Sequence, residues 1–112
     1  MIDEPVLRKM LDGIANADPA RRDEWTDAVA DLARSFDADQ AELTARSLAR
    51  AVLTETDSDL REAELNALAE LITWHQIDKQ TVGTVLSIDS TVLGPSEREA
   101  LDDLRSYYNG TW

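Results

Sequence analysis

The stretch DSDLREAELNALAELITWH, residues 57–75, decides the fold. Its apolar side chains recur at three- and four-residue spacing, as they do on one face of an α-helix. This stripe consists of Leu60, Ala63, Ala67, Leu68, Leu71 and Ile72, and it is widened by Leu65, Ala69 and Trp74. A surface helix needs only a narrower apolar arc, so the pattern predicts a central helix with neighbours on both sides.

Helix-start signals precede this segment and recur along the chain. The segment itself begins with Asp57, Ser58 and Asp59, which are typical N-cap residues. Four further apolar stripes follow capping signals at Asp3, Asp18, Asp37 and Ser96. The spacing of a capping box is found in Asp39 with Glu42, in Asp59 with Glu62 and in Ser96 with Glu99. Each of these segments is therefore predicted to be an amphipathic helix.

Residues 78–89 are compatible with two structures. The segment is rich in β-branched residues and contains Gly83, which weakens a helix. Asp78 could cap a short helix that turns Val82, Val85 and Leu86 inward. We predict a helix, because every other segment is helical and a single strand would have no partner.

These segments together predict an all-α fold, with about six antiparallel helices in a HEAT-like or helical-bundle array. The length favours one domain over residues 1–112. The Asp-x-Asp and Leu-Ala pairs of residues 37–52 recur in residues 57–72, so two helices per unit would give a period near forty residues. Capped amphipathic helices of similar length would align about as well, and both interpretations stay open.

The charge balance narrows the choice of partner. The chain has 23 acidic and 11 basic residues, a formal net charge of −12. Such a protein is expected to repel nucleic acid and anionic membranes and to attract a basic protein, although the acidity could also serve solubility alone. There is no cysteine and no run of eighteen apolar residues, and MIDEPVLRKM lacks the apolar core of a signal peptide. We therefore expect a cytoplasmic protein that does not enter the membrane.

The sequence offers little for catalysis or metal binding. His75 is the single histidine, and we expect it to interact with the last carbonyls of its own helix. The aspartate pairs at 37/39 and 57/59 lack the glycine of a calcium loop and are read as caps. We expect no catalytic residue, no metal and no cofactor. An enzyme built on a chance acid pair remains an alternative, and it would show a concave pocket with carboxylates of raised pKa.

Two stretches carry a resemblance to a known group of proteins. They are REAELNALAELITWHQI (residues 61–77) and VLSIDSTVLGPSEREALDDLRSYY (residues 85–108). From about residue 37 to residue 108 the chain resembles small, all-helical, HEAT-like immunity proteins of bacterial polymorphic and contact-dependent inhibition toxin systems. The resemblance rests on helix pattern, size and acidity, and the first helix lies outside it. It implies binding of a cognate toxin domain, often a basic nuclease, without indicating which residues bind.

The candidate partner-binding residues come from the chain itself. They are acids on the outer helix faces and a terminal aromatic residue, namely Asp23, Asp27, Asp31, Glu62, Glu70 and Trp112. Tyr107 and Tyr108 are further possible anchors, or else they pack in the core. The acids could equally form solvated faces. The alternative function is a helical adaptor or a dimerising regulator without enzymatic activity, and the oligomeric state stays open.

Overall fold

The computed structural model describes residues 1–108 and, within them, contains only helices. The α-helices are α1 (Glu4–Ile14), α2 (Pro19–Leu32), α3 (Ala38–Thr54), α4 (Ser58–Trp74), α5 (Lys79–Leu86) and α6 (Pro95–Ser106). Two short 3-10 helices are η1 (Ala33–Ser35) and η2 (Ser90–Val92). The all-α prediction is confirmed, and the ambiguous segment 78–89 forms a helix rather than a strand.

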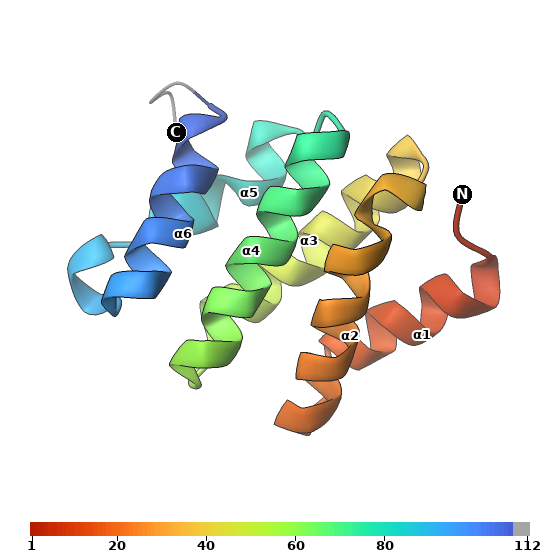
Figure 1. Ribbon diagram of the computed structural model, residues 1–112, viewed down its shortest axis with the longest axis horizontal. Coiled ribbons are helices and arrows are strands. Elements are labelled where there is room, and N and C mark those ends of the chain that lie inside the picture. The colour runs from red at the N-terminus through yellow and green to blue at the C-terminus, as the bar shows by residue number, and fades with distance from the viewer. Residues whose placement is uncertain (109–112) are drawn as a thin grey trace.

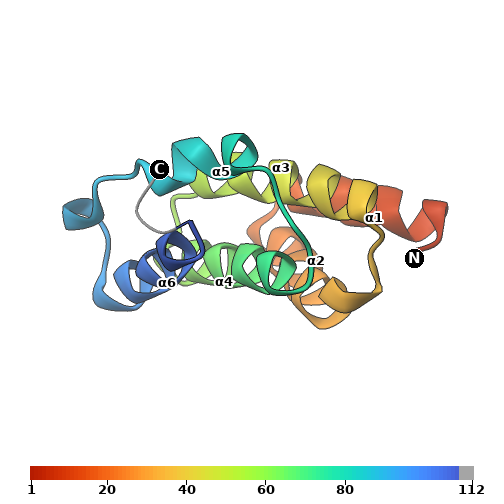
Figure 2. The same cartoon turned by 90° about the horizontal axis from the view of Figure 1, so that it is seen from above.

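The helices form two layers. Figure 2 shows α1, α3 and α5 in one layer and α2, α4 and α6 in the other. In Figure 1, α2, α4 and α6 all run in the same direction, and the helices of the other layer return the chain. The three helices of the second layer begin at Pro19, Ser58 and Pro95, roughly forty residues apart, which is the period of a HEAT-like array.

Helix α4 has the central position that its apolar pattern predicts. It packs between α2 and α6 within its layer and against α3 in the other layer. Leu65, Leu68 and Leu71 are fully buried along this helix. Trp74 is an exception, since it is 49% exposed and the guanidinium of Arg34 lies 4.6 Å from the centre of its ring.

Three predicted capping boxes are wrong by two residues. Helix α3 is capped by Asp37, whose carboxylate accepts a hydrogen bond from the Gln40 amide at 2.8 Å. Helix α6 begins at Pro95, because proline suits the first helical position and makes Gly94 the N-cap. The Gly94 amide then donates to the Glu97 carboxylate at 3.3 Å. The pairs Asp39 with Glu42 and Ser96 with Glu99 therefore do not form the boxes. Asp59 with Glu62 does not form one either, because Asp57 caps α4 and accepts from the backbone amides of Asp59 and Leu60.

Gly13 has a packing role that its sequence position did not suggest. It lies near the C-terminal end of α1, where it is helical and buried. The indole of Trp25 lies directly over it, so that a Cβ atom at Gly13 would be 1.9 Å from Trp25 Cδ1. The missing side chain therefore allows α1 and α2 to approach each other closely.

Candidate functional site

The acidic residues of the helices are concentrated in one layer of the structure. Helices α2, α4 and α6 carry twelve acidic and five basic residues, whereas α1, α3 and α5 carry four acidic and five basic residues. Ten of the twelve acids are at least partly exposed. The surplus negative charge of the helices thus lies almost wholly on the α2–α4–α6 layer.

Most arginines of that layer form hydrogen bonds with other groups of the fold. Arg22 and Arg61 donate hydrogen bonds to the buried carboxylates of Glu55 and Glu97. Arg98 and Arg105 donate to backbone carbonyls of Leu93, and of Leu86 and Ile88. Four of the five basic residues therefore bond to groups of the fold, and Arg105 also lies 3.9 Å from the carboxylate of Asp102. Acidic residues of these helices still outnumber the basic ones by twelve to five.

A groove of about 440 Å³ crosses the three helices of the acidic layer. It is lined by Ala30 of α2, by Asn66, Ala69, Glu70 and Thr73 of α4, and by Asp103, Ser106 and Tyr107 at the α6 end. Two carboxylates, Glu70 and Asp103, meet there. Tyr107 is 47% exposed, and its hydroxyl lies 2.9 Å from Thr73 Oγ1. The groove thus combines negative charge, hydroxyl groups and an aromatic ring.

The structure brings only some of the predicted site residues to this groove. Glu70 lines it directly. Asp23, Asp27 and Asp31 are exposed on α2 and lie close enough together to interact, because the pKa of Asp27 is raised by partial burial and then by the charges of Asp23 and Asp31. Glu62 lies instead beside a smaller hollow of about 200 Å³ where α4 meets the start of α6.

Of the aromatic residues named as candidates, only some lie at the groove in the part of the chain that the structure describes. Tyr107 lines the groove, but Tyr108 is partly buried and its hydroxyl donates to the Ile77 carbonyl at 3.1 Å. Trp112 lies outside the described residues. Asp103 was missed as a candidate, although its place opposite the apolar stripe of the last helix could have indicated it.

Sequence reasoning also missed a buried polar cluster. Glu64 on α4 is 0% exposed, and no donor from another residue reaches either oxygen of its carboxyl group, so any hydrogen bond that it makes needs its own proton. It lies against Glu55, a buried carboxylate at the end of α3, with which it can share a proton. Glu55 also receives two hydrogen bonds from the Arg22 guanidinium, at 2.9 and 3.0 Å. A sequence signal existed, because Glu64 falls four residues from both Leu60 and Leu68 within the apolar stripe.

The pKa values of the two carboxyl groups in this cluster are shifted in opposite directions. Burial raises the pKa of Glu64 to about 8, and the hydrogen bond with Glu55 and the charge of Glu55 add to this effect. Burial also tends to raise the pKa of Glu55. Hydrogen bonds from Arg22, Glu64 and the Asp57 amide outweigh it, so that the pKa of Glu55 is lowered. Glu55 is therefore the ionised partner at neutral pH, and Glu64 is the neutral one.

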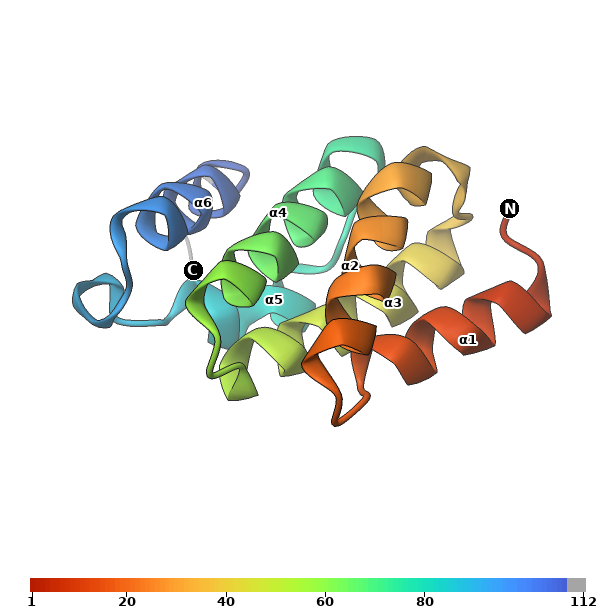
Figure 3. The same ribbon diagram turned by 60° about the horizontal axis from the view of Figure 1, so that its bottom comes forward.

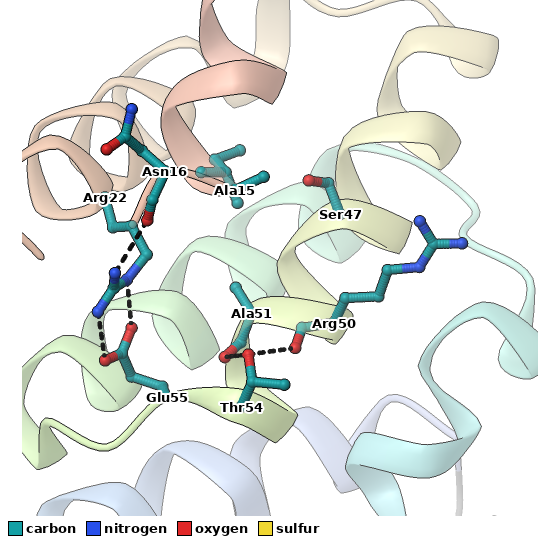
Figure 4. Close-up of a pocket in the computed structure, with 9 residues that line it drawn as sticks. Ala15, Asn16, Arg22, Ser47, Arg50, Ala51, Thr54 and Glu55 are labelled. Carbon is teal, nitrogen blue, oxygen red and sulfur yellow. Dashed lines mark hydrogen bonds and ion pairs between the residues drawn. The ribbon is translucent and has the colours of Figure 1, made fainter. Parts of the chain in front are cut away.

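A cavity of about 330 Å³ lies beside this cluster, between the α1–α2 loop, α2 and α3 (Figure 4). Glu55 is the carboxylate in its lining, and Figure 4 shows the Arg22 guanidinium directed at it, whereas Arg50 points away. Glu64, the carboxyl group with the raised pKa, does not line the cavity. The cavity thus presents a carboxylate that an arginine holds, and not the carboxyl group whose pKa is raised.

His75 does not bind the carbonyls of its own helix as expected. Its Nε2 atom lies 2.7 Å from the carbonyl oxygen of Ala33 in η1. The side chain therefore ties the end of α4 to the end of α2. Among residues 1–108, no group of three or more potential metal ligands is close enough together to hold an ion. None of the described helices combines the length and apolar character needed to cross a bilayer.

Comparison with known proteins returned no match to a family model, to a curated protein or to a solved structure.

Proposed function

We propose that this protein is an immunity protein, which binds and neutralises a basic toxin domain through the acidic face of α2, α4 and α6. The observation that carries the proposal is the unequal charge of the two layers. Carboxylates on a single face attract a cationic partner, speed its diffusional encounter and fix its orientation. In this role we expect the protein in the cytoplasm, beside the toxin that it neutralises.

The groove across the three helices gives this face its most detailed feature. An arginine or lysine of the partner could extend its methylene groups over Ala30 and Ala69 and bring its charge between Glu70 and Asp103. The exposed ring of Tyr107 offers a surface on which a guanidinium can stack. The three exposed aspartates of α2, Asp23, Asp27 and Asp31, would extend the negative potential beyond the groove.

The first test is a growth assay with the protein encoded by the neighbouring gene. Expression of that protein alone is expected to stop growth, and co-expression with this chain is expected to restore it. If the neighbouring product is harmless, or stays toxic in the presence of this chain, the proposal fails. Sedimentation of the chain alone distinguishes the alternative, because a dimerising regulator would show a mass that rises with concentration.

The second test locates the interface by charge reversal. The variant with Glu70→Lys and Asp103→Lys changes the groove, whereas Asp12→Lys and Asp39→Lys make the same change in net charge on the other layer. At low salt we expect the groove variant to slow association with the toxin at least about tenfold and the control to change it much less. Equal effects from both variants would mean that total charge, rather than this face, determines binding.

A further inference from the structure

The cluster around Glu64 connects one edge of the molecule. The Arg22 guanidinium donates to the carbonyls of Asn16 and Ala17 in the α1–α2 loop, at 2.9 and 3.0 Å, as well as to Glu55 at the end of α3. In Figure 3, the α1–α2 loop and the connection from α3 to α4 lie on the same edge of the molecule. The edge is thus held by side-chain hydrogen bonds between segments far apart in the sequence.

The same cluster continues into α4 and α6. Arg61 of α4 donates to the Glu97 carboxylate at 2.7 Å and to the backbone carbonyl of Glu55. Glu97 in turn accepts the hydrogen bond from the Gly94 amide that starts α6. The N-terminal ends of α2, α4 and α6 therefore meet at a single set of charged groups, and Glu64 lies within it.

The charges of this set balance only when Glu64 is neutral. The groups that face Glu64 are the guanidinium of Arg22 from α2, the carboxylate of Glu55 from the α3–α4 connection and the guanidinium of Arg61 on its own helix, which Glu97 of α6 holds. Two arginines pair with two carboxylates. A third negative charge, fully buried beside Glu55, would have no donor and no partner of its own.

We propose that Glu64 is a proton-operated latch, which keeps the N-terminal ends of α2, α4 and α6 together when its carboxyl group is neutral and lets them separate when it ionises. A neutral Glu64 supplies the hydrogen that the Glu55 carboxylate accepts. An ionised Glu64 competes with Glu55 for Arg22 or draws water into the edge, and either event breaks the connection between the helices.

The direction of the pH effect follows from the two states. In the closed state burial raises the pKa of Glu64 to about 8, and in an open, hydrated state it returns toward its ordinary value of 4.5. Between these values the closed state binds one proton more than the open state, so opening becomes easier as pH rises. The opening constant should increase about tenfold per pH unit from roughly pH 5 to 7.5 and become constant above about pH 8.

Amide hydrogen exchange at a series of pH values between 5 and 9 tests the latch on the whole chain. After correction for the intrinsic exchange rate, protection of the amides in the first two turns of α4 should fall about tenfold per pH unit below pH 8. Amides of α5, which lies away from the cluster, should show a larger opening free energy than these amides at every pH, because the edge opens without unfolding the rest of the chain. The variant Glu64→Gln should abolish the pH dependence, and the control Glu70→Gln, on the exposed face of the same helix, should retain it.

Two results would overturn the proposal. The same opening free energy in α4 and α5 at every pH would show that ionisation unfolds the chain as a whole rather than opening one edge. A pH dependence that persists in Glu64→Gln would assign the proton to another group. A carbon NMR titration of the Glu64 carboxyl group gives an independent readout, and a midpoint near the ordinary value of 4.5 would also refute the latch.

Discussion

The close contact between Gly13 and Trp25 leads to a prediction about the stability of Gly13→Ala. The change should destabilise the fold when the Trp25 ring is present and stabilise it when the ring is absent. A methyl group at Gly13 would lie 1.9 Å from Trp25 Cδ1 and 2.2 Å from Cγ, about half of an ordinary van der Waals separation. The indole must therefore move, and the helices α1 and α2 must separate if it cannot. Gly13→Ala is thus expected to disturb the packing between the first two helices.

The expected magnitude is the difference between two opposing effects. Overpacking a close contact costs about 1–3 kcal/mol. Replacing glycine by alanine in a helix returns up to about 1 kcal/mol. Because the overlap is deep, the cost lies in the upper half of that range, about 2–3 kcal/mol, and the net result for Gly13→Ala is a loss of about 1–2 kcal/mol in the free energy of unfolding. For a domain of this size that loss corresponds to a decrease in Tm of about 4–8 °C.

A double-mutant cycle separates the contact from the backbone effect. When Trp25→Ala removes the ring, the same Gly13→Ala change should become stabilising, by about 0.5–1 kcal/mol. Urea unfolding followed by circular dichroism measures all four free energies. If Gly13→Ala stabilises the original chain, or has the same effect with and without the ring, then close approach to Trp25 is not why glycine occupies this position.

Three further predictions concern side chains with defined partners. Glu64→Gln should stabilise the fold by about 3 kcal/mol at pH 7, because glutamine needs no proton to be buried, and thermal unfolding should show this gain vanishing as pH falls toward 4.5. Arg22→Met should destabilise by about 3 kcal/mol or more in urea unfolding, since it leaves the buried Glu55 carboxylate without its guanidinium. Arg34→Ala should leave stability within about 1 kcal/mol while changing the fluorescence of Trp74, whose exposed ring it covers.

The helices could be predicted because each has a local signal. Proline at the first helical position and an aspartate before it are present in α2, and the buried Leu48 and Val52 follow at the expected spacing in α3. The central position of α4 followed from its wide apolar arc. Cap positions were less certain, because several acids precede a helix and only backbone geometry decides which one accepts the amide hydrogen bond.

The candidate site could be predicted only in part, because its features combine distant segments. The negative charge of α2 and α4 was visible in the sequence, but the groove needs Asp103 from α6, whose neighbour in space depends on the layering of the helices. The cluster around Glu64 joins residues 22, 55, 61 and 97. No local pattern predicts that these side chains meet, and burial of a glutamate runs against the ordinary preference of that residue type.

Three glutamates of α4 differ in exposure only because of where the helical period places them. Glu62 and Glu70 reach the surface, whereas Glu64 lies on the same side as Leu60 and Leu68 and is buried. Two positions of displacement along a helix rotate a side chain by about 200°, which is enough to move it from water to the core. The formal charge of −12 counts all three as ionised. With Glu64 neutral in the folded state, the protein carries one negative charge fewer at pH 7, and that charge returns only when the fold opens or the pH exceeds about 8.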